Sequence, residues 1–282
     1  MELGVSKGLT MELTNENYHS QEAQMEYMGS SQYKAFRRCP KCALAKIKGE
    51  YVEEQTESLL VGSYIDAYFS NEMEDFKEKN KDVMFTKQGQ LKSEYKKADQ
   101  IIEFIEKDPV MKRSLSGEHQ VIMTGEIAGV PFKIKIDSYF PGKAIIDQKV
   151  MKDMEPIWNE ETFCKENFVE HWGYLYQGCV YQEIVYQNTG KRLPFFLSVV
   201  TKEKIPSKAL LSLDQEDLDL ALDEIKRLAP IFQRYKQTGE FSEEDKKVLD
   251  AYGVKEQCGK CDYCKETYMV KNVVSYHDKD PK

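Results

Sequence analysis

Three ionisable residues around a predicted turn have types and spacing suited to phosphodiester chemistry. Asp147 and Lys149 follow the apolar run at residues 144–146, and Asp137 lies ten residues before Asp147. Residues two apart on a strand share a face, so Asp147 and Lys149 should project together. Mg²⁺ prefers carboxylate and water oxygens, and a bound divalent ion can activate water beside a phosphate. The lysine is a point charge that can orient that water or stabilise developing charge.

An Asp-x-Lys set is also typical of an exposed salt bridge, because charged side chains on one strand face commonly pair in solvent. Taken alone, the pattern favours this ordinary interpretation. The apolar run before Asp147 and the second carboxylate at Asp137 shift the balance towards a metal site at one end of a sheet.

A strand-rich centre should position these residues. Residues 118–137 are expected to form a hairpin that turns near Ala128-Gly129, because apolar and charged residues alternate along 130–137. Pro141-Gly142 predicts a turn, and residues 144–150 predict the next strand. We expect a helix over 32–49, capped by Ser30-Ser31 and interrupted or kinked at Pro40, and further helices over 57–76, 91–107, 168–190 and 214–239, the last of them kinked or split at Pro230. A strand is expected over 193–203, and loops are expected over 11–30, 71–90 and 151–168.

Composition narrows the class of protein. The 282 residues are 41% hydrophobic and 31% charged, which is typical of a soluble globular protein. No apolar run approaches the ~18 residues of a membrane span, and no export signal is present, so we expect no membrane contact and a cytoplasmic location. The net charge of −8 does not indicate nucleic-acid binding, so a DNA surface would need a local basic patch or a bound metal.

A second group of candidate ligands lies near the end of the sequence. Cys258, Cys261 and Cys264 are spaced by two residues, and the odd total of seven cysteines with no export signal indicates a reducing compartment. Three thiolates at this spacing suit zinc or an iron–sulfur cluster and need a fourth ligand. Cys39 or Cys42 could supply it, which would join both ends of the chain. Free thiols are the ordinary alternative.

The stretch KIKIDSYFPGKAIIDQK resembles the D…(D/E)-x-K core of the PD-(D/E)XK nuclease superfamily, and in particular its RecB-like exonucleases and phage exonuclease VIII (RecE-like) branch. GSYIDAYF resembles the G-[ST]-x-x-H helix of RecB-like enzymes, with Asp66 in place of the histidine. Glu118 matches a common acidic position. Gln177 and Tyr181 match a Q-x-x-x-Y motif, although their helical spacing is also typical of an ordinary amphipathic helix.

The resemblance implies a metal-dependent DNA nuclease, an exonuclease on double-stranded ends that acts in phage-type recombination beside a single-strand annealing protein. Asp137 and Asp147 would bind Mg²⁺ or Mn²⁺, with Asp66 and Glu118 assisting. Lys149 would position water. Gln177 and Tyr181 would orient the substrate or the lysine. Related exonucleases form rings around DNA, so a homo-oligomer is one expectation.

AddB-type nucleases resemble this chain in placing one cysteine before the nuclease core and three after it, where the four hold a [4Fe–4S] cluster. By that resemblance Cys39 joins Cys258, Cys261 and Cys264, with Zn²⁺ as the alternative because the last gap here is short. A zinc-binding structural module is a further hypothesis.

The expected fold is α/β, with a PD-(D/E)XK restriction-endonuclease-like core of mixed sheet flanked by helices, N-terminal helices and a C-terminal cysteine-rich appendage. We expect an irregular N-terminal extension over 1–29, a nuclease domain over 30–245, and a segment over 246–282 that packs back on the N-terminal helix and ends in a polar tail. The alternative function is a catalytically inactive DNA-binding or regulatory protein on the same fold.

Overall fold

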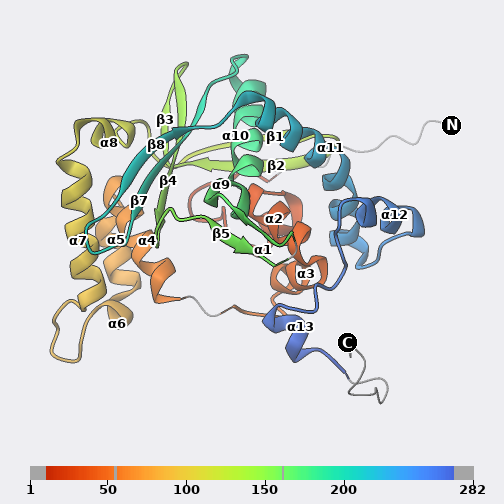
Figure 1. Ribbon diagram of the computed structural model, residues 1–282, viewed down its shortest axis with the longest axis horizontal. Helices are drawn as coiled ribbons and strands as arrows, with labels where there is room; N and C mark the ends of the chain where they lie inside the picture. The colour runs from red at the N-terminus through yellow and green to blue at the C-terminus, as the bar shows by residue number, and fades with distance from the viewer. Residues whose placement is uncertain (1–10, 54–55, 161, 270–282) are drawn as a thin grey trace.

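A mixed four-stranded sheet lies at the centre of the computed structural model, which describes residues 11–53, 56–160 and 162–269 (Figure 1). The sheet order is β3-β4-β7-β8, from β3 (Ser138–Phe140), β4 (Ala144–Met151), β7 (Phe195–Thr201) and β8 (Lys208–Ser212). Strand β4 pairs in parallel with β7, and the other pairs are antiparallel. The parallel pair requires a crossover between β4 and β7, and that crossover contains the helix α10 (Tyr174–Thr189).

A separate antiparallel hairpin precedes this sheet. It consists of β1 (Val121–Ile127) and β2 (Val130–Ile136), joined by Ala128 and Gly129 with φ values of 51° and 78°. Two positive φ angles in a two-residue turn match the twist of the flanking strands. The expected hairpin and its turn are confirmed, although β1 begins three residues later than expected.

Helices cover both faces of the central sheet (Figure 1). One buried apolar cluster includes Val200 and residues of α4 (Glu57–Phe69), α7 (Ser93–Glu106) and α8 (Pro109–Ser114). The other includes Val199 and residues of α10, α2 (Ser30–Arg38) and α11 (Gln215–Thr238). Successive residues of a strand point to opposite faces, so β7 contributes to both clusters. The expected mixed α/β sheet flanked by helices is therefore confirmed.

Further helices and one small hairpin complete the described part of the fold. They are α1 (Gln21–Glu26), α2 (Ser30–Arg38), α3 (Pro40–Lys48), α4 (Glu57–Phe69), α5 (Met73–Lys79), α6 (Lys81–Met84), α7 (Ser93–Glu106), α8 (Pro109–Ser114), β5 (Ile157–Asn159), β6 (Cys164–Glu166), α9 (Phe168–His171), α11 (Gln215–Thr238), α12 (Glu243–Ala251) and α13 (Asp262–Glu266).

Several local expectations were wrong. Residues 71–90 contain α5 and α6, and the acidic first turn and basic last turn of α5 suit its helix dipole. Residues 151–168 contain the β5–β6 hairpin, and residues 11–30 contain α1. The strand β8 was not expected. The helix expected over 168–190 is interrupted at Gly173, which has φ of 62°.

Proline has different effects at two helical positions. Pro40 begins α3, where a missing N–H costs no hydrogen bond, so the expected interruption at this residue is confirmed. Pro230 lies inside α11, which continues as one helix and is not split. Its neighbours Ala229 and Ile231 are buried, so tertiary packing holds the helix together across the lost hydrogen bond.

Two expected terminal segments, the first part of the N-terminal extension and the polar tail, are not described by the structure. Residues 1–10 and the polar tail over 270–282 lie outside the described residues. No helix among the described residues is both long and apolar enough to span a membrane.

Candidate active site

Asp147 and Lys149 lie on one face of β4, as their spacing predicts. The Nζ atom of Lys149 is 2.5 Å from Oδ2 of Asp147, and the Asp147 side chain is 2% exposed. The strand is central in the sheet, so its backbone hydrogen bonds on both sides fix where these two side chains project. Asp147 is therefore buried and Lys149 half-buried, which excludes the exposed surface salt bridge.

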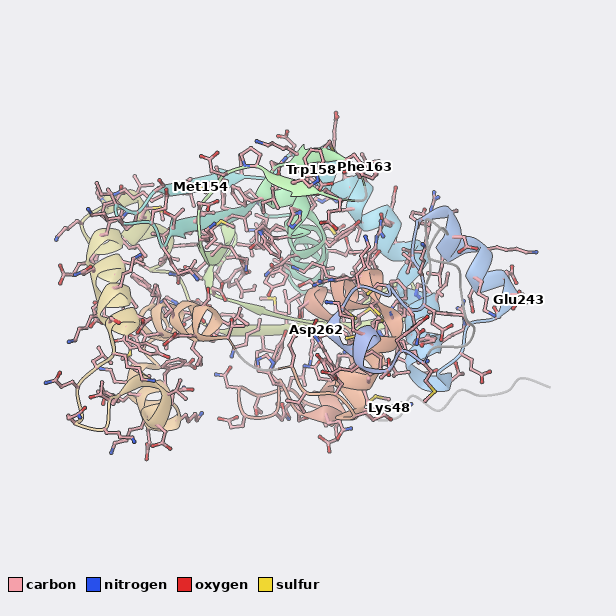
Figure 2. All side chains as sticks on the ribbon, turned by 60° about the horizontal axis from the view of Figure 1, so that its bottom comes forward. Lys48, Met154, Trp158, Phe163, Glu243 and Asp262 are labelled. Carbon is pink, nitrogen blue, oxygen red and sulfur yellow. The ribbon has the colours of Figure 1, made fainter. Side chains whose placement is uncertain are left out.

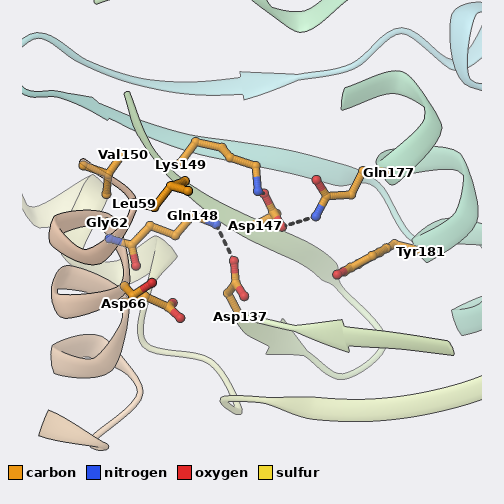
Figure 3. Close-up of a pocket in the computed structure, with 11 residues that line it drawn as sticks. Leu59, Gly62, Asp66, Asp137, Asp147, Gln148, Lys149, Val150, Gln177 and Tyr181 are labelled. Atoms are coloured by element: carbon orange, nitrogen blue, oxygen red, sulfur yellow. Dashed lines mark hydrogen bonds and ion pairs between the residues drawn. The ribbon is translucent and has the colours of Figure 1, made fainter. Parts of the chain in front are cut away.

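Asp137 joins this pair because of a change of sheet. It lies between β2 and β3, where the chain leaves the hairpin and enters the central sheet beside β4. The backbone N–H of Gln148 donates to Oδ2 of Asp137 at 2.8 Å. This bond ties the second carboxylate to the residue between Asp147 and Lys149 (Figure 3).

Helix α10 contributes Gln177 and Tyr181 from the side of the pocket opposite α4 (Figure 3). Nε2 of Gln177 donates to Oδ1 of Asp147 at 2.5 Å, and the Tyr181 hydroxyl donates to the carbonyl of Lys135 at 2.9 Å. Gly178 allows α10 to pack closely on α11, because a Cβ there would lie 2.9 Å from a methyl carbon of Leu218. Gln177 therefore contacts a carboxylate of the site, and not Lys149 as one expectation had it.

Asp66 enters from α4, whose apolar face packs in the second buried cluster. Its carboxylate points into the pocket from that helix (Figure 3). Gly62 lies one turn earlier and also lines the pocket. A Cβ at Gly62 would lie 4.0 Å from Cβ of Val150, an ordinary contact with a side chain, so no close backbone approach requires a glycine there.

These residues enclose a pocket of about 320 Å³. Its lining includes Asp66, Asp137, Asp147, Lys149, Gln177 and Tyr181. Glu118 is not among the lining residues. Its side chain is exposed, and its backbone pairs with Tyr139 in an isolated bridge. The structure therefore brings together six of the seven residues expected around the metal and leaves Glu118 outside.

The family model described as a PDDEXK-like domain of unknown function (DUF3799) matches residues 29–267. The chain belongs to this PDDEXK-like family. The solved structure of a "Putative exonuclease" from Eubacterium rectale is similar, with 40% sequence identity and a TM-score of 0.84 over 94% of this chain and 97% of that chain. Curated proteins include no match. The expected membership in the PD-(D/E)XK superfamily is confirmed.

The PDDEXK-like pocket concentrates negative charge. Burial raises the pKa of Asp137 well above its usual range, and Asp147 and Asp66 raise it further. Burial and the charge of Asp147 raise the pKa of Asp66 to about 6. Burial lowers the pKa of Lys149, but Asp147 and Asp137 outweigh that effect and hold it above its usual value. Three carboxylates thus face one lysine, which favours binding of an additional cation.

The donor set fits a hard divalent cation. Carboxylate oxygens are the ligands that Mg²⁺ and Mn²⁺ prefer. Oδ2 of Asp147 is buried and accepts no hydrogen bond, although the ammonium of Lys149 lies beside it. The short distance is an ion pair without hydrogen-bond alignment, so this oxygen keeps a lone pair for a further ligand.

Sequence reasoning missed Gln148 as a pocket residue. Its side chain lines the pocket, and its buried Nε2 has no hydrogen-bond partner among the described residues. It occupies the unspecified middle position of the D-x-K pattern, so no sequence signal identified it. An unpartnered amide N–H beside three carboxylates is a donor available to an anionic substrate.

The cysteine site also assembles in this PDDEXK-like chain. The Sγ atoms of Cys39, Cys258, Cys261 and Cys264 all lie within 4.8 Å of one another. Cys39 lies in the extended break between α2 and α3. Helix α13 packs against that break (Figure 1). In Figure 2, the labels of Asp262 and Lys48 mark the first residue of α13 and the last residue of α3. Cys39, and not Cys42, completes the group.

Backbone N–H groups support the thiolates of this cluster. The N–H groups of Lys260 and Cys261 donate to Sγ of Cys258 at 3.4 and 3.3 Å. Burial opposes ionisation of Cys258, but these hydrogen bonds outweigh it and lower its pKa to about 7. Outside this group, Cys42 and Cys179 are buried and Cys164 is exposed.

Proposed function

We propose that this protein is a metal-dependent DNA nuclease, an exonuclease that hydrolyses phosphodiesters at double-stranded DNA ends. The observation that carries the proposal is the arrangement of buried Asp147 with half-buried Asp137 and Lys149 around a pocket of about 320 Å³. The pocket holds both metal-type ligands and a lysine beside the same space. The similar solved structure from Eubacterium rectale, whose title reads "Putative exonuclease", supports the same class of reaction.

Asp137 and Asp147 would hold Mg²⁺ or Mn²⁺, with Asp66 assisting from α4. The bound ion would supply an activated water and neutralise charge on the phosphate. Lys149 places a positive charge at the same point, where it orients the attacking water and stabilises the negative charge that develops on the phosphate oxygens. Gln177 holds the Asp147 carboxylate in one orientation, and it is a positioning residue because its contact is with Asp147.

We also propose that the protein acts in phage-type recombination in the cytoplasm, beside a single-strand annealing protein. This role rests on the resemblance of the D…D-x-K stretch. A ring-shaped homo-oligomer around DNA rests on the same resemblance. Light scattering of the purified protein tests the assembly, and a mass of one chain at micromolar concentration would contradict it.

Digestion of end-labelled linear DNA and closed circular DNA tests the central reaction. We expect Mg²⁺ to release nucleotides from linear duplex DNA, EDTA to stop the release, and circular DNA to survive. Cutting of the circle would contradict the requirement for an end. Binding of linear DNA without any cutting would replace this proposal with the inactive DNA-binding alternative.

The four-cysteine site calls for a second, structural metal. Four thiolates around one Zn²⁺ lie about 3.8 Å apart, because Zn–S bonds of about 2.3 Å point to the corners of a tetrahedron. The Sγ atom of Cys39 is 3.5 Å from that of Cys264 and 4.0 Å from that of Cys261. In a [4Fe–4S] cluster each thiolate binds a different iron, which spreads the sulfurs further. The spacing supports Zn²⁺ over the [4Fe–4S] cluster that the resemblance implied.

Metal analysis after anaerobic purification tests this choice. We expect about one zinc per chain and a colourless protein. A brown protein that absorbs near about 400 nm, with four irons per chain, would establish the iron–sulfur alternative.

A further inference from the structure

We propose that Lys34 binds a backbone phosphate of the DNA strand close to the phosphate that is cut, as a second cation of the active site. The inference rests on the proposed nuclease function and adds a substrate contact to it. Lys34 belongs to α2 and lies outside the D…D-x-K, Q-x-x-x-Y and cysteine patterns.

One aromatic ring connects Lys34 to the catalytic lysine. The Nζ atom of Lys34 lies 5.3 Å from the ring centroid of Tyr174, and Nζ of Lys149 lies 5.2 Å from the same centroid. The separation of the two nitrogens is therefore at most the sum of these distances. This upper limit equals the axial rise of about three nucleotides of one strand at about 3.4 Å each, so the two ammonium groups lie no further apart than that. A strand with one phosphate at Lys149 thus has a nearby phosphate within reach of Lys34.

The position of Lys34 is fixed before any ligand binds. Its Nζ donates to the carbonyl of Trp172 at 3.1 Å. Its aliphatic stem packs on Gly173, where an added Cβ would lie 3.0 Å from Cδ of Lys34. Gly173 is the N-cap of α10, the helix that carries Gln177. The ammonium is therefore held at the start of α10, the helix whose Gln177 orients the carboxylate of Asp147. Because its position is already fixed, Lys34 loses less entropy when it binds a phosphate.

The charge of Lys34 lacks a counterion. No ion pair joins it to a carboxylate among the described residues, whereas Arg37 on the same helix lies 2.6 Å from Oε1 of Glu224. Burial, together with the charge of Lys149, lowers the pKa of Lys34 to about 8, although Asp147 acts in the opposite direction. An unpaired, partly desolvated ammonium is stabilised by an anion, and a DNA phosphate is the anion that the adjacent site would bring.

A purely structural role makes a different prediction. The bond to Trp172 could serve only to satisfy a carbonyl at the end of α9. Glutamine at this position has a similar stem and keeps a donor, but it carries no charge. Lys34→Gln therefore separates the two roles, and Lys34→Arg restores the charge.

The experiment measures binding of a short DNA duplex in Mg²⁺ buffer at several salt concentrations, in an Asp147→Asn background so that the DNA stays intact. Lys34→Gln should reduce the slope of log K against log salt by about 0.9, the value for one lost phosphate contact, or by about 0.7 if the bound strand is single. Lys34→Arg should restore the slope. The matched control is Lys247→Gln, an exposed lysine of α12 at the far edge of the molecule (Figure 2, which labels Glu243 of that helix).

The outcomes separate this inference from the nuclease proposal. With Asp147 intact, Lys34→Gln should raise KM about tenfold and leave the melting temperature near that of Lys247→Gln. Equal salt slopes and equal KM values for Lys34→Gln and Lys247→Gln would overturn the inference, even if the parent cuts DNA. A parent that never cuts DNA but shows the Lys34-dependent slope would overturn the nuclease proposal and keep the phosphate contact.

Discussion

The side-chain amide of Gln177 donates to Oδ1 of Asp147 at 2.5 Å across 30 residues of sequence. Lys149 lies at the other oxygen of the same carboxylate. Each oxygen of Asp147 therefore has one polar neighbour, and both neighbours are fixed by secondary structure. The carboxylate has a single orientation towards the pocket, which is the condition for binding a metal with defined geometry.

Loss of the Gln177 amide should impair catalysis without unfolding the protein. For Gln177→Ala we expect kcat/KM on linear DNA to fall about 10- to 100-fold, because partners that orient a metal ligand typically contribute this much. Steady-state cleavage assays measure the change. Gln187→Ala is the matched control on α10, since Gln187 bonds to Glu126 outside the pocket. Equal rates for the two variants would contradict the positioning role.

Asp66 should destabilise the metal-free protein at neutral pH. Its pKa is about 6 in the folded state, above the usual 3.8, so the folded state holds the proton longer than the unfolded state. Stability should therefore fall as pH rises from about 4 through 6 and remain lower above that range.

Asp66→Asn should remove that fall. In EDTA at pH 8 we expect the variant to be more stable than the parent by on the order of 1–3 kcal/mol, as judged by urea unfolding. Divalent metal should stabilise the parent more than the variant. A variant that is less stable than the parent in EDTA at pH 8 would show that Asp66 has a favourable partner in the folded state.

The cysteine site should require Cys39 and not its neighbour on α3. We expect Cys39→Ser to lower bound metal per chain and the melting temperature, because a ligand that ties α13 to the start of α3 is lost. Cys42→Ser should keep the metal, since the Cys42 thiol is outside the four-sulfur group. Elemental analysis with thermal unfolding measures both. Full metal content in Cys39→Ser would contradict the assigned ligand set.

Lys236 should stabilise the N-terminal segment against the core. It is 1% exposed, and its ammonium donates to the carbonyls of Gln24 and Tyr27 and to Oε1 of Gln32. Lys236→Met would leave these acceptors without a donor, so we expect a loss of about 2–4 kcal/mol in unfolding free energy. Lys247→Met on the surface is the control. Equal denaturation midpoints for the two variants would contradict the role.

Local pattern was sufficient for the strand that carries the site. The alternation before Asp137 and the apolar run before Asp147 depend on burial of one strand face, which is visible in sequence. The pair on β4 and the hairpin turn at Ala128-Gly129 follow from such local rules. The family resemblance added Asp66, Gln177 and Tyr181, and all three line the pocket.

Other features depend on tertiary contacts that no local pattern contains. Glu118 was placed at the start of a strand, but β1 begins at Val121, and the side chain of Glu118 is exposed. The bond from Gln177 to Asp147 requires the crossover that places α10 beside β4. Lys34 meets Tyr174 only because α2 packs on the start of α10, so its charge gave no signal in the sequence.

Cleavage of end-labelled linear duplex DNA by the parent and by Asp147→Asn, with Mg²⁺ and with EDTA, tests the central claim most directly. Asparagine keeps the shape of the side chain but removes the charge that binds the metal. Asp153→Asn, an acidic residue just beyond β4, is the control. We predict Mg²⁺-dependent release of nucleotides by the parent and by Asp153→Asn, and at least about 100-fold slower release by Asp147→Asn. Equal release by Asp147→Asn and the parent would contradict the account.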